Sequence, residues 1–451
     1  MASFFDVKVC LPIQASKLWP FWNQSSKIET MAINPTSRVT ASRPKRAVKR
    51  EALLDEATRQ INMRGAGAVS LNAIAEAAGL SRNTLYYYVS DRADLAFRCY
   101  LRTCEANTED LAIAIEQGSN ICERIEHYIA RTLTNSRHPL AVLSDQDFLP
   151  EPQRSMIGEL NRRNVETLKA LINDGIETDQ IRAVQSEIAA QALLGMINWS
   201  QLSAMWLGQR DGRSFRRRAS AAIADLFFNG IAANRGERFD NSLDAAQLIT
   251  QPVNPFDRMQ ASQQKMLQLI GAASRLFNRR GLDGASLDEI GAGVGVTKGA
   301  VYHYFDDKTD LILRCYERGF ELYDIFMDAA IAQGTNGFER SMAVMHLNCQ
   351  AQASAAPPLM LQPGLWALPE AQRNRFIAAA SDLWKRSNAM LQAGVNDGSC
   401  RHCDAAMIAE VSAGAFLWLP KWLPENYPLS PPAIADQLCD LLAFGVAKKS
   451  R

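Results

Sequence analysis

The chain lacks the features that would place it in a membrane or among enzymes. Its 451 residues contain no stretch that approaches the roughly 18 uninterrupted apolar residues of a membrane-spanning helix. Histidine is scarce, and none of the five histidines belongs to a serine–histidine–acid arrangement or a paired-carboxylate motif. We therefore predict no catalytic residues, no enzymatic activity and no membrane partner. The net charge of +1 points to no particular partner.

Cysteine is present nine times but in no paired pattern. The odd number, the wide spacing and the absence of a convincing secretory leader favour reduced thiols in a cytoplasmic setting. The run C-R-H-C at 400–403 is only half of a zinc site, because zinc needs four ligands and usually takes them from two such runs. The glycines at 291–295 lack the G-x-G-x-x-G spacing of a dinucleotide loop. We predict no metal and no cofactor.

A long internal repeat dominates the chain. Residues 64–100 read RGAGAVSLNAIAEAAGLSRNTLYYYVSDRADLAFRCY, and residues 280–316 read RGLDGASLDEIGAGVGVTKGAVYHYFDDKTDLILRCY, a gap-free match at an offset of 216. A weaker match pairs Gly195 and Trp199 with positions 219 further on, and Asp225 and Gly230 with positions 215 further on. A unit of roughly 190 to 200 residues is therefore duplicated whole.

Each copy opens with three segments of helical periodicity. The first carries apolar residues at helical spacing over 53–61 and 269–277, and a glycine ends it in each copy. The second begins at an N-cap serine, Ser70 or Ser286, and in the second copy Glu289 completes a capping box. Gly79 or Gly295 then allows a tight turn into a third, short helix. Two short helices joined by such a turn form a helix-turn-helix signature.

This pattern resembles the N-terminal domain of the TetR family of bacterial transcriptional regulators. The carrying residues are the runs S-x-x-x-I-A-x-x-A-G-L-S-x-x-T-L-Y-Y-Y-V-x-D-R-x-x-L in the first copy and GVTKGAVYHYFDDKTDL in the second. The resemblance covers about 50 residues per copy, and the remainder matches only in length and helical character. It implies a double-stranded DNA partner, an all-α fold, a small hydrophobic inducer and a cytoplasmic, nucleoid-associated bacterial regulator. The tandem arrangement departs from the family, whose members pair as separate chains.

The third helix of each copy, with its flanks, holds the residues that we expect to contact DNA. They share donor groups or aromatic tips of the kind that reach phosphates and base edges. A basic run at 38–50 precedes the first helix, in the place of an arm that reaches phosphates or the minor groove. The predicted contacts are Arg46, Ser81, Arg82, Asn83, Thr84, Tyr86, Tyr87, Arg92, Thr297, Lys298, Gly299, Tyr302, His303 and Lys308.

The predicted division has six parts. They are an extension with the basic arm at 1–45, expected to be disordered, a first DNA-binding domain at 46–95, a first helical regulatory domain at 96–233, a semi-flexible linker at 234–261, a second DNA-binding domain at 262–311 and a second regulatory domain at 312–451. Within the linker, the stretch 243–249 favours a short helix that could pack. Met31 is an alternative start, which would make the first thirty residues an upstream extension.

Tryptophan is concentrated in the regulatory domains. Trp199, Trp366 and Trp418 are candidates for an inducer pocket, although ordinary core packing would explain each of them equally well. The last two helices of each copy are where the family dimerises, so we expect an intramolecular pseudo-dimer, with a further homodimer left open.

The two copies differ where they would read DNA, which predicts an asymmetric operator. Arg82-Asn83-Thr84 in the first copy corresponds to Lys298-Gly299-Ala300 in the second. Gly291 and Gly293 also replace alanines on the supporting helix of the second copy, and each glycine costs about 0.8–1 kcal/mol there. The expected function is a repressor released by an inducer. The alternative is a ligand-binding or protein-interaction protein whose second, or both, helix-turn-helix units no longer read DNA.

Overall fold

The computed structural model describes residues 43–135, 138–206, 212–234, 236, 239, 242–250 and 257–448. The chain divides into the units Met1–Val48 and Lys49–Arg451, and every contact given below lies within the second. In the described part of the chain the regular elements are helices, accompanied by two isolated β-bridges. The prediction of an all-α fold is confirmed. Met31 and the arm up to residue 42 lie outside the described residues.

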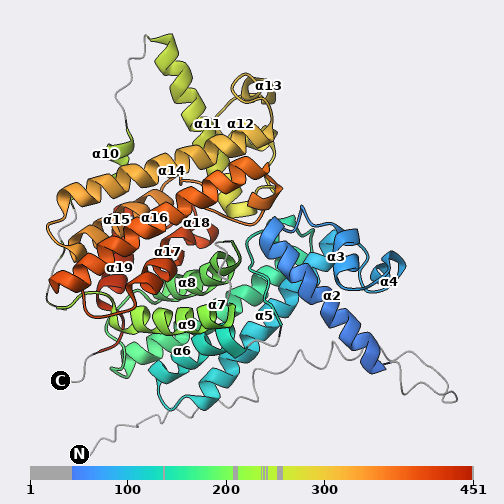
Figure 1. Cartoon of the computed structure of the whole chain (residues 1–451), viewed down its shortest axis with the longest axis horizontal. Coiled ribbons are helices and arrows are strands. Elements are labelled where there is room, and N and C mark those ends of the chain that lie inside the picture. Colours follow the sequence, from blue (N-terminus) through green and yellow to red (C-terminus); the bar gives the residue numbers. More distant parts are fainter. Residues whose placement is uncertain are drawn as a thin grey trace, which may run out of the picture. The chain divides into compact units, whose positions relative to one another are not determined.

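The described residues of the first copy form eight α-helices, shown from blue to green in Figure 1. They are α2 (Arg43–Arg64), α3 (Leu71–Ala77), α4 (Arg82–Tyr86), α5 (Arg92–Gln117), α6 (Ile121–Ala130), α7 (Gln153–Glu177), α8 (Ser186–Trp206) and α9 (Gly212–Asn229). A π-helical turn, Arg131–Asn135, and a 3-10 turn, Gln146–Phe148, lie between α6 and α7.

The second copy repeats this order. Its α-helices are α11 (Arg258–Arg280), α12 (Leu287–Gly293), α13 (Lys298–Val301), α14 (Lys308–Gln333), α15 (Gly337–Gln352), α16 (Glu370–Asp397), α17 (Ala405–Leu417), α18 (Leu419–Trp422) and α19 (Pro431–Phe444), with a 3-10 turn at Leu365–Ala367. The long helices α5 and α14 each begin beside the helix-turn-helix and run into the regulatory part. The two parts of a copy therefore share a rigid element.

The predicted linker is partly packed. Helix α10 (Ala245–Ile249) lies within it and contacts α14 and α15. The amide of Gln350 fixes this segment, since its oxygen accepts from Ala245 N at 3.0 Å and its nitrogen donates to Leu243 O at 2.9 Å. Ala245 joins a small core with Phe326 and Leu347. This part of the linker is thus held on the second copy.

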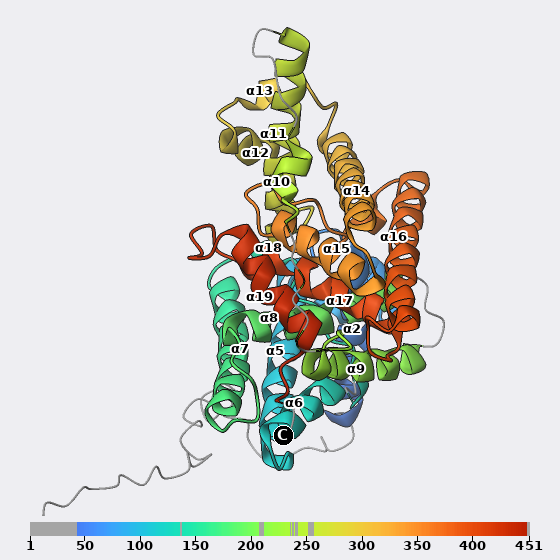
Figure 2. The ribbon, with the colours of Figure 1, turned by 90° about the vertical axis from the view of Figure 1, so that its left-hand side faces the viewer.

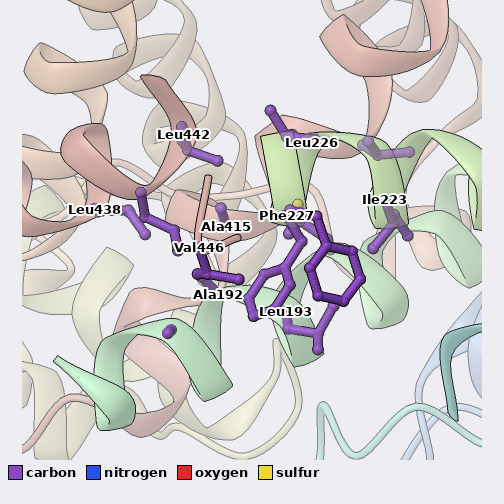
Figure 3. Packing of buried hydrophobic residues seen from close by; sticks show 14 of the residues in the cluster. Ala192, Leu193, Ile223, Leu226, Phe227, Ala415, Leu438, Leu442 and Val446 are labelled. Atoms are coloured by element: carbon purple, nitrogen blue, oxygen red, sulfur yellow. The ribbon is translucent and has the colours of Figure 1, made fainter. Parts of the chain in front are cut away.

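One hydrophobic core joins the two copies. Side chains of α8 and α9 interleave with side chains of α17 and α19, as the labelled residues in Figure 3 show. Figure 2 shows the same four helices from the side. Gly195 and Gly414 lie where α8 crosses α17, and a Cβ added to either glycine would collide with the carbonyl oxygen of the other. Small residues at this crossing allow the close approach.

Reciprocal ion pairs flank this core. Arg182 of the first copy pairs with Asp440 of the second at 2.6 Å, and Arg401 of the second pairs with Asp225 of the first at 2.8 Å. Arg182 Nε also donates to the carbonyl oxygen of Gly445, near the end of the second copy. In the same way, Arg401 Nε donates to the carbonyl oxygen of Gly230, near the end of the first copy. Such self-complementary contacts are the mark of an interface with twofold character.

Candidate nucleic-acid interface and buried cavities

Two N-cap serines and one glycine set the ends of the two short helices in the helix-turn-helix of the first copy. Ser70 Oγ accepts from Ala73 N at 3.3 Å to start α3, and Ser81 Oγ accepts from Thr84 N at 3.2 Å to start α4. Gly79 between them has φ +67°, a left-handed backbone that favours glycine. These local signals fix where each short helix begins and ends.

Helix α4 presents polar and aromatic side chains to solvent while Leu85 anchors it in the core. The Arg82 guanidinium carbon lies 5.8 Å from the centroid of the Tyr86 ring. Arg82 and Asn83 are exposed, and Tyr86 and Tyr87 keep 46% and 64% of their surface. An exposed aromatic pair beside an arginine is suited to phosphate and base-edge contact.

The second copy has the same plan with different side chains. The capping box is present, since Ser286 N donates to Glu289 Oε2 at 3.0 Å and Glu289 N donates to Ser286 Oγ at 3.2 Å. Gly295 has φ +70°, and Thr297 Oγ1 accepts from Ala300 N at 3.4 Å to cap α13. The predicted capping box is confirmed.

An exposed ion pair joins α13 to α12. Lys298 Nζ lies 3.1 Å from Asp288 Oδ2, and this hydrogen bond raises the pKa of Lys298. Gly299 and His303 are exposed, and Tyr302 keeps 49% of its surface. In the first copy an asparagine stands at the position of Asp288, so Arg82 has no such acidic neighbour there.

Local charge separates the two motifs further. Residues 70–92 hold two acidic and two basic residues, whereas 286–308 hold four acidic and two basic residues. A negative surface repels the phosphate backbone. The first copy therefore has the more favourable electrostatics for DNA.

Arg92 and Lys308 take equivalent places at the start of α5 and α14. Arg92 donates from Nη1 to Gly67 O at 2.6 Å, and Lys308 donates from Nζ to Asp283 O at 3.4 Å. Partial burial lowers the pKa of Lys308. Both side chains thus tie the turn after the first helix to the rest of the motif. Arg46 is exposed on α2.

A cavity of about 140 Å³ lies in the regulatory part of the second copy. Helices α14 to α17 line it, and Trp199 of the first copy closes it on one side. Its wall is mainly apolar and aromatic, with Phe320, Trp384 and Phe416 among the contributors. We call this space the second-copy cavity.

One carboxyl group stands in this apolar wall. Glu410 on α17 is 6% exposed, and its Oε1 has no hydrogen-bond partner among the described residues. Burial raises its pKa. Asn348 of α15 donates its amide nitrogen to Val344 O at 2.7 Å, which leaves its Oδ1 without a described partner. The cavity therefore presents two unpaired acceptor oxygens.

A second cavity, of about 90 Å³, lies at the equivalent place in the first copy. Trp418 of the second copy lines this first-copy cavity, just as Trp199 lines the other. Its wall is richer in amides, such as Asn107, Asn198 and Gln191, and it includes the ammonium group of Lys421.

The three tryptophans predicted to line an inducer pocket lie at three different places. Trp199 and Trp418 line the second-copy and first-copy cavities respectively. Trp366 lines neither; its ring lies 6.1 Å from that of Trp206, and Arg373 lies 5.9 Å above it. The second-copy cavity thus takes one tryptophan from the other copy, and the first-copy cavity takes two, Trp418 and Trp422.

The loop around Asp145 lies at the ends of α2 and α11, the first helix of each copy, and contacts α18. Asp145 Oδ2 accepts from Ala66 N at 3.0 Å at the end of α2, and a Cβ added at Gly281, the end of α11, would lie 2.7 Å from Oδ1. Lys421 on α18 donates to Ser144 O at 2.7 Å. Burial raises the pKa of Asp145 and lowers the pKa of Lys421 to about 8.

Sequence reasoning did not find Glu410, Asp145 or Lys421. A lone acid in an apolar helix carries little signal by itself. The weak offset of 219 could have found Glu410, because it aligns that residue with Gln191, which lines the first-copy cavity.

Among the described residues, no cluster of histidine, cysteine, aspartate or glutamate side chains is placed to hold a metal ion. None of the described helices is long and apolar enough to cross a membrane.

Comparison with known proteins matches both copies. The family described as "Bacterial regulatory proteins, tetR family" matches residues 53–99 and 269–315. The family described as "Tetracyclin repressor-like, C-terminal domain" matches residues 120–231 and 340–446. These four matches cover most of the chain and separate the DNA-binding part of each copy from its regulatory part.

Individual relatives match one copy at a time. The HTH-type transcriptional regulator AcrR of Shigella flexneri is 40% identical over 58 residues, 13% of this chain and 27% of AcrR. The HTH-type transcriptional repressor KstR2 of Rhodococcus jostii is 24% identical over 201 residues, 43% of this chain and 96% of KstR2. The TetR-family structure of PfmR from Thermus thermophilus is 21% identical with a TM-score of 0.35, covering 40% of this chain and 99% of PfmR. The chain thus spans about a quarter of the length of AcrR.

Proposed function

The chain belongs to the TetR family of bacterial regulatory proteins, and on this premise we propose that it is a sequence-specific DNA-binding transcriptional regulator. The observation that supports this most is the pair of capped helix-turn-helix motifs, each with an exposed recognition helix, attached to one continuous core. The relatives are named as transcriptional regulators, which agrees with a non-enzymatic protein.

We propose further that the two copies act as an internal pseudo-dimer. The reciprocal pairs Arg182–Asp440 and Arg401–Asp225 and the Gly195–Gly414 crossing support this arrangement. An internal pair needs no second chain to present two recognition helices. Because their side chains differ, the operator should have two unlike half-sites, spaced about one helical turn or roughly 34–36 Å apart.

The second-copy cavity is the proposed inducer site. A largely apolar cavity with a few polar groups is the usual form of a small-molecule site. Ligand binding would favour one arrangement of α14 to α17, and the loop around Asp145 supplies a route to the ends of α2 and α11. An inducer that prefers the arrangement with low DNA affinity releases the repressor, and the coupling is reciprocal.

A narrower role for the second copy is favoured by one observation. Lys298 is engaged by Asp288 on the same surface, so its charge is partly neutralised before DNA arrives. The first copy would then provide most of the DNA affinity, while the second copy senses the ligand and contributes a weaker half-site.

The test is DNA binding by single-residue variants. A duplex selected from a random pool is titrated with the full chain and followed by fluorescence anisotropy. Arg82→Ala should weaken binding about tenfold or more, because a lost base or phosphate contact costs about 1–3 kcal/mol. Lys298→Ala should weaken it less. Arg162→Ala, on the exposed side of α7, is the control and should bind like the unaltered chain. Unchanged affinity in Arg82→Ala would remove the first copy as the main reader.

A further inference from the structure

The two cavities occupy equivalent places in the two copies, but the side chains that line them differ in chemistry. Positions 219 apart line both of them. Leu194, Ile197 and Asn198 line the first-copy cavity, and their counterparts Ala413, Phe416 and Leu417 line the second-copy cavity. The change from Asn198 to Leu417 removes an amide. The second-copy cavity is thus the more apolar version of one shared design.

One pair of equivalent positions differs in the opposite sense, with the more polar group in the second-copy cavity. At the same offset, Gln191 of the first-copy cavity corresponds to Glu410 of the second-copy cavity. The apolar site has therefore a carboxyl where the polar site has a neutral amide. Burying a carboxylate without a partner is costly, and protein interiors normally supply a cation.

No such cation is supplied by the wall itself. The described residues that line the second-copy cavity include no lysine, arginine or histidine. The two indole donors of the wall are already engaged, since Trp199 Nε1 donates to the Glu410 backbone oxygen at 3.0 Å and Trp384 Nε1 donates to Ala406 O at 3.3 Å. Burial raises the pKa of Glu410, and the neutral hydroxyl of Ser203 beside the carboxyl offsets part of this rise but brings no positive charge. Among the residues that line the cavity, the buried polar atoms left without a described partner are both acceptors, Glu410 Oε1 and Asn348 Oδ1.

We propose that the second-copy cavity binds a hydrophobic cation, an aromatic or aliphatic amine or quaternary ammonium, with its charge beside Glu410. The aromatic wall suits the same ligand, because the faces of tryptophan, tyrosine and phenylalanine rings attract cations. Trp199, Phe320, Tyr323, Trp384 and Phe416 supply such rings. The apolar remainder of the ligand fills the space among the methionine and leucine side chains. This proposal rests on the proposed function only where it concerns the release of DNA by the bound cation.

The test uses a matched pair of probes and the full chain. Benzyltrimethylammonium and neopentylbenzene have the same shape and differ in charge. Binding is followed by quenching of tryptophan fluorescence, since Trp199 and Trp384 line the cavity. Glu410→Gln should lower the affinity for the cation about tenfold or more, equivalent to about 1.4 kcal/mol. The same variant should leave the affinity for neopentylbenzene within about twofold.

Two controls locate the site. Gln191→Ala, a substitution at the equivalent position of the first copy, should leave the affinity for the cation unchanged. Circular dichroism of Glu410→Gln should match the unaltered chain, because glutamine already stands at the corresponding place in the first copy. An equal loss of both probes in Glu410→Gln, or no loss of either, would overturn the assignment of a cation site.

The consequence at DNA is measured separately. The cation is added to the protein–DNA complex at saturating concentration. Release of DNA by the unaltered chain but not by Glu410→Gln supports both the cation site and the inducer role. Selective cation binding without release upholds the site and contradicts the inducer role. DNA binding that persists with no charge-selective ligand binding contradicts the site alone.

Discussion

Gly291 and Gly293 stand on the same short helix, α12, in different surroundings. A Cβ added at Gly291 would lie 2.9 Å from Val296 O and 3.2 Å from a Val301 methyl group, whereas one added at Gly293 would meet nothing within 4 Å. Sequence reasoning treated both as a cost to the helix. The structure shows that Gly291 lets α12 approach the turn before α13, so only Gly293 is a simple cost.

Gly293→Ala should therefore stabilise the protein, by at most about 0.8–1 kcal/mol, because this difference between glycine and alanine applies to a helix interior and Gly293 is the last residue of α12. Gly291→Ala is the matched comparison and should give no gain, because the new methyl group meets backbone. Chemical denaturation measures both. A gain of equal size from the two variants would contradict this account of α12.

Glu410 should make stability depend on pH in a definite direction. Burial raises its pKa above the ordinary 4.5, so the folded chain holds this proton more tightly than the unfolded chain does. Its stabilising contribution is complete below pH 4.5 and is lost as the pH rises through the folded-state pKa.

Glu410→Gln stays neutral and should therefore melt at a higher temperature than the unaltered chain near pH 8, with a gain that disappears toward about pH 4. Differential scanning calorimetry across this range provides the measurement. Glu126→Gln, which removes an exposed carboxyl from α6, should show no such gain. A gain in Glu410→Gln that is constant with pH would rule out the titration of Glu410 as its source.

At the level of single residues, the sequence predicted the caps and turns, and it indicated two of the tryptophans that line the cavities, but it did not predict the carboxyl group of Glu410. Ser70, Gly79 and Ser81 act through contacts within a few positions, which a local pattern can reveal. Glu410 acts through helices far apart in the chain, and nothing in its neighbourhood in the sequence distinguishes it from a surface acid.

The recognition helices α4 and α13 differ in how their first basic residue is engaged. Arg82 lies over the Tyr86 ring, while Lys298 pairs with Asp288. The Lys298–Asp288 pair is solvent-exposed and contributes little to stability. Its larger effect should fall on DNA, because it withholds a cation and adds an anion at the same surface.

Asp288→Asn should consequently strengthen DNA binding and steepen the slope of log affinity against log salt by about 0.9, the value for one added phosphate contact. Anisotropy titrations over a series of salt concentrations give this slope. Asp174→Asn, on the exposed face of α7, is the control for the loss of one distant negative charge. An unchanged slope in Asp288→Asn would mean that Lys298 does not reach a phosphate.

Elements were predicted better than their connections. The paired helices of each helix-turn-helix agree with the expected positions because capping and periodicity are local. In the linker, the short helix favoured over 243–249 agrees with α10, but its packing partners were not predicted, since α10 contacts α14 and α15 and Ala245 bonds to Gln350, more than a hundred positions away in the chain. The helices α5 and α14 also cross the expected domain boundaries, so each copy has no flexible joint at these positions.

The scattered identical residues in the second half of the repeat are explained by the contact between the two copies. Gly195 and Gly414 face each other, Trp199 and Trp418 each line a cavity of the other copy, and Asp225 pairs with Arg401. Residues that touch a partner with twofold character are constrained in both copies, whereas ordinary core positions can exchange one apolar side chain for another. Sequence alone showed that these positions recur, but not what they contact.

The central proposal is that two different helix-turn-helix motifs on one core bind DNA together. Its most direct test is to select bound sequences from a random DNA pool with the full chain and with Arg82→Ala. We expect one chain to bind a site with two unlike half-sites about one helical turn apart, and Arg82→Ala should lose sequence information in one half only. A perfect palindrome whose halves both weaken in Arg82→Ala would show that like copies from two chains pair on DNA, and it would contradict the internal pair.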